Sequence, residues 1–221
     1  TIWDPQKDAK RSIENHQNYA YAALVDPKLA EGMPLKLAVS SALDAVAHAV
    51  ESYWAKGTNC VSKALALRAI RIIMGHLEKL LAGQAEAHDA MAQGSMLAGL
   101  AFSNTKTTAC HSISYPLTMH YGIPHGTAVS MLLAPVLEIN APGIEEPEEL
   151  LAALGVAGPR ELEKRIQNIL RQSGQPASLQ EWGVRHEDLE RLAKLGLTKG
   201  RADNNPVEIT PERIQAILES I

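Results

Sequence analysis

One carboxylate and three imidazoles stand out in this sequence as side chains that could bind a metal ion together. Asp44 and His48 are four residues apart in a segment with helical periodicity, so both side chains leave the same face of a helix about one turn apart. His111 and His125 follow, separated by thirteen residues that contain the break YGIP. This break would let two successive helices each present one imidazole to a common point. We therefore predict a metal site formed by these four residues.

The residue types in this set indicate a catalytic metal. Structural zinc sites usually use cysteine thiolates, and this set contains none. One Asp and three His suit Fe(II), Zn(II) or Mn(II), with a coordination position left open for a substrate. Simpler interpretations exist for each residue taken alone. Asp44 and His48 could form a buried polar pair, His111 could be a capping or core histidine, and His125 could serve the turn before its helix.

The order and surroundings of these residues resemble the metal-binding half of the iron-containing (group III) alcohol dehydrogenases. The resemblance rests on the segment DAVAHAVESY at residues 44–53 and on the H-x13-H segment ending in GIPHG, and it extends from LVDPKL at 24–29 to the tail ADNNPVEIT. It implies an NAD(P)-linked oxidoreductase in which the four residues hold Fe(II), or alternatively Zn(II). That metal would polarise the substrate oxygen for hydride transfer. NAD(P)H would be bound mainly by another domain.

One position departs from the family pattern. Many members carry a further histidine four residues after the first histidine of the H-x13-H segment, thought to relay a proton, and Tyr115 occupies this position here. A phenol with a pKa near 10 is a poorer proton relay at neutral pH. Tyr115 is therefore our candidate catalytic residue, with a changed role. The segment KTTACHSISYPL looks most similar to the branch that reduces phosphonoacetaldehyde and related anionic aldehydes, in which Lys106 would pair with the anionic head group.

The resemblance also implies a domain organisation. No glycine precedes Gly32, so the opening residues cannot provide a glycine-rich phosphate loop. We expect residues 1–30 to be a remnant of the end of an N-terminal dinucleotide-binding domain and residues 31–221 to form a helical metal-binding and substrate domain. The chain would then be the C-terminal half of a longer enzyme, inactive in isolation.

Composition favours an all-α fold. The chain has 221 residues, of which 46% are apolar and only 4% aromatic. Alanine and leucine dominate, and these residues favour close-packed helices. From Pro34 the periodicity is helical, with an apolar stripe at Val39, Leu43, Val46, Val50 and Trp54. Further helices are predicted from Asn59 to Gly83 and over 86–102, 127–140, 146–153, 160–173 and 186–195, with a last one starting at Thr210. The resemblance implies the helical bundle of the dehydroquinate synthase-like C-terminal half.

Charge and cysteine content limit the partners and the location. The formal net charge is −4 with both signs interspersed, so we expect neither a nucleic-acid nor a membrane partner. No apolar run approaches the roughly 20 residues of a membrane span. Cys60 and Cys110 suggest no disulfide framework. We expect a cytoplasmic homo-oligomer that acts on a small aldehyde or alcohol.

Two alternatives to this function fit the sequence. Dehydroquinate synthase and glycerol dehydrogenase resemble the same family and also use a metal beside a dinucleotide domain, although the D-x-x-x-H spacing argues against them. The chain could also be a non-catalytic helical module with a vestigial metal site. The remaining histidines have no motif partner and are expected at the surface or as satisfied core residues: His16, His76, His88, His120 and His186.

Overall fold

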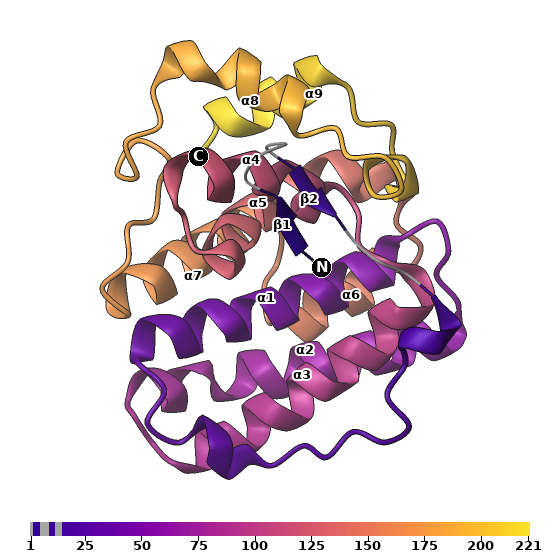
Figure 1. The fold of residues 1–221 in the computed structure, drawn as a ribbon, viewed down its shortest axis with the longest axis vertical. Helices are drawn as coiled ribbons and strands as arrows, with labels where there is room; N and C mark the ends of the chain where they lie inside the picture. Colours follow the sequence, from indigo (N-terminus) through magenta and orange to yellow (C-terminus); the bar gives the residue numbers. More distant parts are fainter. Residues whose placement is uncertain (1, 5–8, 12–14) are drawn as a thin grey trace.

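Helices make up most of the computed structural model, which describes residues 2–4, 9–11 and 15–221 (Figure 1). The α-helices of these residues are α1 (Leu35–Trp54), α2 (Cys60–Leu81), α3 (Glu86–Thr105), α4 (Ala109–Tyr121), α5 (His125–Asn140), α6 (Pro147–Leu154), α7 (Pro159–Gln172), α8 (Leu189–Leu195) and α9 (Pro211–Glu219). Short 3-10 helices cover His16–Asn18, Pro27–Ala30, Ala141–Gly143, His186–Asp188 and Ala202–Asn204. The prediction of an all-α fold is confirmed.

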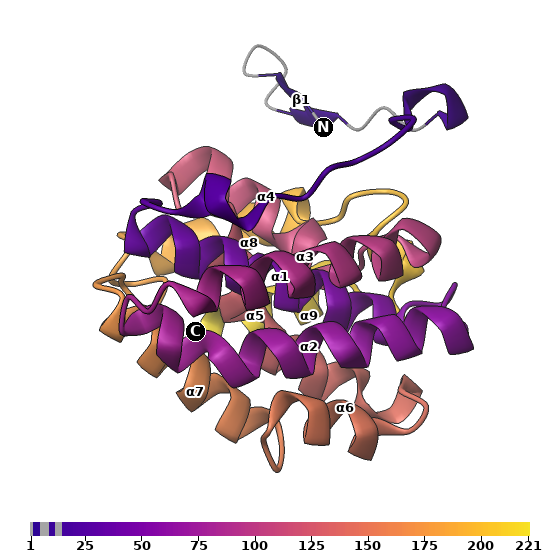
Figure 2. The same ribbon diagram turned by 90° about the horizontal axis from the view of Figure 1, so that it is seen from below.

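Among the described residues, two strands form one small antiparallel pair near the N-terminus. β1 (Ile2–Asp4) pairs with β2 (Ala9–Arg11), with Trp3 opposite Lys10. Figure 2 shows this pair outside the helical body. Residues 17–30, which follow, are almost all exposed, including Tyr21 and Leu24. The proposed domain boundary near residue 30 stays a prediction.

Helix α1 is the central helix of the body and contacts α2, α3 and α5. All five residues of its predicted apolar stripe are buried: Val39, Leu43, Val46, Val50 and Trp54. Between them lie buried alanines such as Ala45, Ala47 and Ala49. Small side chains allow the neighbouring helices to approach α1 from several directions, so that polar residues on its remaining face come close to α4 and α5.

Local signals in the sequence explain where the helices begin and end. Asn59 caps α2 through the backbone N–H groups of Val61 and Ser62, and the Ser62 hydroxyl accepts from the Asn59 N–H to complete a capping box. Gly122 adopts a left-handed conformation (φ 65°) that ends α4. The helix predicted over 127–140 begins two residues earlier, at His125, and continues through Pro135 to Asn140. Cys60 and Cys110 are both free, as expected.

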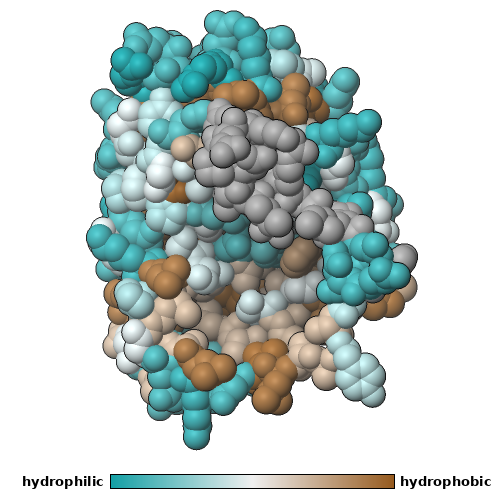
Figure 3. All heavy atoms as spheres, viewed as in Figure 1, coloured by the Kyte–Doolittle hydropathy of each residue, from teal (hydrophilic) through white to brown (hydrophobic). Residues whose placement is uncertain are grey.

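Apolar side chains also reach the surface. On the face seen in Figure 3 they gather around a depression in the lower half of the view. Exposed apolar residues of the N-terminal segment, α1 and α3 include Leu29, Met33, Leu37, Met96 and Leu100. None of the helices in the described part of the chain is both long and apolar enough to cross a membrane.

Candidate metal centre

Three helices bring three of the predicted ligands together. Asp44 lies in the middle of α1, His111 lies in the first turn of α4, and His125 is the first residue of α5. Among the residues that the structure describes, these three form the group whose ligand atoms could hold a metal ion, all within 4.8 Å of one another. Oδ1 of Asp44 lies 3.5 Å from Nε2 of His111 and 3.8 Å from Nε2 of His125.

These distances suit a shared cation better than direct hydrogen bonds. Ligand atoms bound at about 2.1 Å in a tetrahedron lie about 3.4 Å apart, close to both separations. Oδ1 of Asp44 and Nε2 of His111 are buried, and neither atom has a hydrogen-bond partner among the described residues. Buried polar atoms normally have partners. The arrangement of Asp44, His111 and His125 therefore fits a divalent metal.

The fourth predicted ligand, His48, lies beside this group but is not part of it. Its ring stacks on that of His111, with centroids 4.5 Å apart, and on that of Phe102 at 4.4 Å. The spacing from Asp44 correctly places both side chains on one face of α1, but the ring of His48 lies flat against those of Phe102 and His111. Its role as a ligand stays a prediction.

Gly126 explains how α5 brings His125 close to α1. A Cβ atom at Gly126 would lie 2.0 Å from the carbonyl oxygen of Ser40 and 2.9 Å from Cβ of Asp44. The Ser40 hydroxyl accepts a hydrogen bond from the backbone N–H of Thr127 at 3.1 Å. The start of α5 is therefore docked on α1 one turn before Asp44, and only glycine permits this approach.

A buried glutamate, Glu51, was not among the predicted site residues. Its Oε2 pairs with Nδ1 of His111, and its Oε1 accepts hydrogen bonds from the Thr108 hydroxyl at 2.9 Å and from the backbone N–H groups of Cys110 at 2.6 Å and His111 at 3.3 Å. The sequence contained a signal for Glu51, because it follows Asp44 by seven residues, about two helical turns, and therefore lies on the same face of α1.

The charges of the site favour cation binding. Burial alone would raise the pKa of Asp44, but the imidazoles of His111, His48 and His125 hold it well below its ordinary value. Burial would likewise raise the pKa of Glu51. The charge of His111 and its hydrogen bond to the carboxylate outweigh burial, so the pKa of Glu51 is lowered. Burial would lower the pKa of His111, yet Glu51 and Asp44 raise it to about 9. Both carboxylates are therefore ionised at neutral pH.

Tyr115 lies next to the ligands, as its spacing from His111 predicts. Its ring stacks on His125 with centroids 5.8 Å apart, and Cζ of Arg201 lies 5.4 Å from the ring centre. Burial raises the pKa of the phenol to about 12, although the charge and hydrogen bond of Arg201 act in the opposite direction. Lys106 is exposed in the α3–α4 connection and has a positive φ of 64°.

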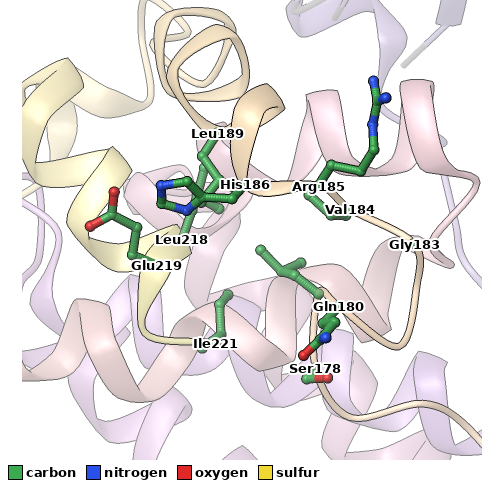
Figure 4. A pocket seen from close by; sticks show the side chains of 11 residues that line it. Ser178, Gln180, Gly183, Val184, Arg185, His186, Leu189, Leu218, Glu219 and Ile221 are labelled. Carbon is green, nitrogen blue, oxygen red and sulfur yellow. The ribbon is translucent and has the colours of Figure 1, made fainter.

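A pocket of about 660 Å³, separate from the candidate metal centre, is formed by residues near the C-terminal end of the chain (Figure 4). Its lining includes His186, Glu219 and the apolar residues Leu189 and Leu218. It shares no lining residue with the candidate metal centre, and it has no group of three metal ligands among the residues described. His186 is exposed, as expected for a histidine without a motif partner.

Comparisons with known proteins found similar sequences and structures for most of this chain. The sequence profile described as "Fe-containing alcohol dehydrogenase family, C-terminal" matches residues 38–221. Lactaldehyde reductase of Escherichia coli is 32% identical over 96% of this chain and 58% of its own length, and 1,3-propanediol dehydrogenase of Klebsiella pneumoniae is 34% identical over 98% and 59%. The structure of sulfoacetaldehyde reductase from Bifidobacterium kashiwanohense in complex with NAD+ superposes with a TM-score of 0.79 at 27% identity, covering 88% of this chain and 52% of that one. The chain thus spans a little over half the length of these curated relatives.

Proposed function

The chain belongs to the Fe-containing alcohol dehydrogenase family, and on that premise we propose that it is the metal-binding and substrate-binding part of an NAD(P)-linked alcohol dehydrogenase or aldehyde reductase. The observation that carries the proposal is the group of Asp44, His111 and His125, in which Oδ1 of Asp44 lies 3.5 Å from Nε2 of His111 and 3.8 Å from Nε2 of His125. The first two of these atoms are buried. These residues would bind Fe(II), with Zn(II) as the alternative. Affinity alone favours Zn(II) at a site of this composition.

Each residue has a defined task in this proposal. Asp44, His111 and His125 bind the cation, and His48 completes the set as the fourth ligand. A bound divalent cation would polarise the oxygen of an alcohol or aldehyde, which favours loss of the alcohol proton or hydride attack on the carbonyl carbon. Tyr115 keeps its proton at neutral pH because its pKa is about 12. It therefore acts as a hydrogen-bond donor beside the reacting oxygen, not as a base.

The hydride donor would be NAD(P)H, held mainly by a dinucleotide-binding domain of the kind expected before residue 31. Two facts support this division. The relatives extend well beyond the part that this chain matches, and one of the similar structures contains NAD+. The exposed apolar residues of the N-terminal segment, α1 and α3 would then be covered by that domain or by a second copy of the chain.

For the substrate, we propose a small aldehyde with an anionic head group. The similarity to a sulfoacetaldehyde reductase supports this class. A cation also lies at the site, because Arg201 contacts the ring of Tyr115, which in turn stacks on His125. Lys106, predicted from the sequence to pair with such a head group, is exposed in the α3–α4 connection, and we propose it as a second cation for the substrate.

Metal binding by the chain itself is the first test. The chain is stripped with a chelator and titrated with Zn(II), or with Fe(II) without oxygen, alongside the variants Asp44→Ala and His125→Ala and the control His186→Ala. We expect one equivalent bound by the unchanged chain and by the control, and a loss of binding of more than about 100-fold in both site variants, a larger loss than removing an outer partner of a metal ligand causes. Equal binding by all four proteins would refute the site.

Substrate class needs a second assay. The longest natural protein that contains this chain is tested with NADH and NADPH against sulfoacetaldehyde, phosphonoacetaldehyde, propionaldehyde and glycerol. We expect the anionic aldehydes to give the highest kcat/KM. Preference for glycerol would instead support a glycerol dehydrogenase-like activity, and no turnover with a fully loaded metal site would support a vestigial site.

A further inference from the structure

We propose that Glu51 is the positioning residue for His111, fixing both the place of its backbone and the orientation of its ring, so that Nε2 faces Asp44 and His125. The inference rests on the proposed metal-binding function of this site. Glu51 is fully buried on α1, sixty residues away from His111 in the sequence. An uncompensated carboxylate in such a place is costly, so its partners identify its role.

The first part of this role concerns the start of helix α4. The N-terminal N–H groups of a helix need acceptors, and the side chain of the N-cap residue, Thr108, does not provide one. Oε1 of Glu51 takes its place by accepting from the N–H groups of Cys110 at 2.6 Å and His111 at 3.3 Å. A carboxylate also suits the positive end of the helix dipole. Glu51 thus holds the first turn of α4 against α1.

The second part concerns the His111 ring. Since Oε1 of Glu51 already accepts three donors, this side chain acts as an acceptor, and Oε2 then accepts a hydrogen from Nδ1 of His111. A neutral imidazole with its hydrogen on Nδ1 has its lone pair on Nε2, the atom that lies 3.5 Å from Asp44. Carboxylates commonly orient metal-binding histidines in this way.

Other side chains hold Glu51 itself in place. The Thr108 hydroxyl donates to Oε1 at 2.9 Å and accepts from the indole Nε1 of Trp54 at 2.8 Å. Trp54 lies one turn beyond Glu51 on α1 and is also buried. The carboxylate therefore has one defined orientation, which is what a positioning residue requires.

The test replaces the carboxylate without changing its shape. In Glu51→Gln the amide oxygen can still accept from the α4 backbone, but its NH₂ group would face Nδ1 of His111 and force the hydrogen onto Nε2. We expect Zn(II) affinity to fall about 10- to 100-fold. The matched control is Glu161→Gln, since Glu161 also accepts from a backbone N–H, that of Ala157 at 2.7 Å, beside the start of another helix. The control should bind Zn(II) like the unchanged chain.

A direct measurement of the tautomer separates positioning from stability. Long-range ¹H–¹⁵N spectra of histidine-labelled protein, at a pH that leaves the imidazoles neutral, report which nitrogen of His111 carries hydrogen. We expect Nδ1–H in the unchanged chain, with and without Zn(II), and Nε2–H in Glu51→Gln. Nε2–H in the unchanged chain, or an unaltered tautomer in the variant, would overturn the inference.

These experiments distinguish a failure of the positioning role of Glu51 from a failure of the proposed metal-binding function. If the unchanged chain binds no Zn(II), the proposed function fails, while the metal-free tautomer still decides the role of Glu51. If Glu51→Gln does not fold, the spectrum of the unchanged chain decides alone. Unchanged Zn(II) affinity in a folded Glu51→Gln refutes the inference and leaves the metal site standing.

Discussion

The imidazole rings of His48 and His111 lie face to face, with centroids 4.5 Å apart and planes inclined by 22°. The ring of Phe102 lies on His48 at 4.4 Å with a similar small inclination of 14°. His48 thus presents the face of its ring to His111. Asp44, one turn earlier on α1, presents a ligand atom, Oδ1, to the same histidine. Stacking requires only an aromatic ring at position 48, whereas metal binding requires an imidazole nitrogen. Substitutions of His48 can therefore distinguish the two roles.

The first prediction concerns His48. Because we propose His48 as the fourth ligand, we expect His48→Ala and His48→Phe both to weaken Zn(II) binding by more than the about 10- to 100-fold loss typical of an outer partner. If its task is to stack between Phe102 and His111, His48→Phe should restore most of the affinity that His48→Ala loses. Competition with a chromophoric chelator measures both values, and His186→Ala serves as the control.

Metal affinity should depend on pH through His111. Glu51 and Asp44 raise its pKa to about 9 against the effect of burial, so at neutral pH the metal-free site holds a proton that must leave before Nε2 can bind a metal. We expect apparent affinity to rise about tenfold per pH unit between pH 7 and 9 and then to level off. Calorimetry in buffers of different ionisation enthalpy should find one proton released at pH 7.5. No proton release there would contradict the prediction.

The stability of the metal-free chain should show the opposite trend. The pKa of His111 is higher in the folded state, about 9, than its ordinary 6.5, so its protonation stabilises the fold fully below pH 6.5, and this contribution is lost as the pH rises through 9. We expect the free energy of unfolding to fall by about 3 kcal/mol across this range. Urea titrations at several pH values measure it. His111→Gln should remove the dependence.

Gly126→Ala should disturb both the fold and the site. Its new Cβ would lie 2.0 Å from the Ser40 carbonyl oxygen, a rigid backbone atom, so α5 must move away from α1 and carry His125 with it. We expect a loss of more than about 2 kcal/mol in unfolding free energy, together with weaker Zn(II) binding. Gly75→Ala in α2 is the control, because nothing lies within 4 Å of its added Cβ. The control should be neutral or stabilising by up to about 1 kcal/mol.

Tyr115 can be tested by turnover in the longest natural protein that contains the chain. With a pKa of about 12 the phenol stays protonated, so it contributes a hydrogen bond and no ionisation between pH 6 and 9. Tyr115→Phe should lower kcat less than the about 100-fold expected for loss of a general acid or base. Tyr115→His should be tolerated and should introduce a titration near neutral pH. Turnover of Tyr115→Phe equal to the unchanged protein throughout this range would leave the residue without a catalytic role.

Local sequence patterns were sufficient to predict the helices and their buried faces. The period of 3.6 residues placed the stripe of α1 from Val39 to Trp54, and caps and glycines marked the helix ends. Such signals act within a few residues, so one sequence can reveal them. The YGIP break likewise predicted that His111 and His125 would lie on successive helices and face a common point. In the structure both belong to the group formed with Asp44.

Only tertiary structure decided how the side chains of the site divide their tasks. Helical periodicity places Asp44, His48 and Glu51 on one face of α1. It does not tell which side chain offers an oxygen to the common point, which stacks its ring and which caps a distant helix. Those differences come from side-chain torsions and from partners about sixty residues away, such as Thr108 and His111 for Glu51. Packing of α4 and α5 against α1 selects these contacts, and no local pattern contains that information.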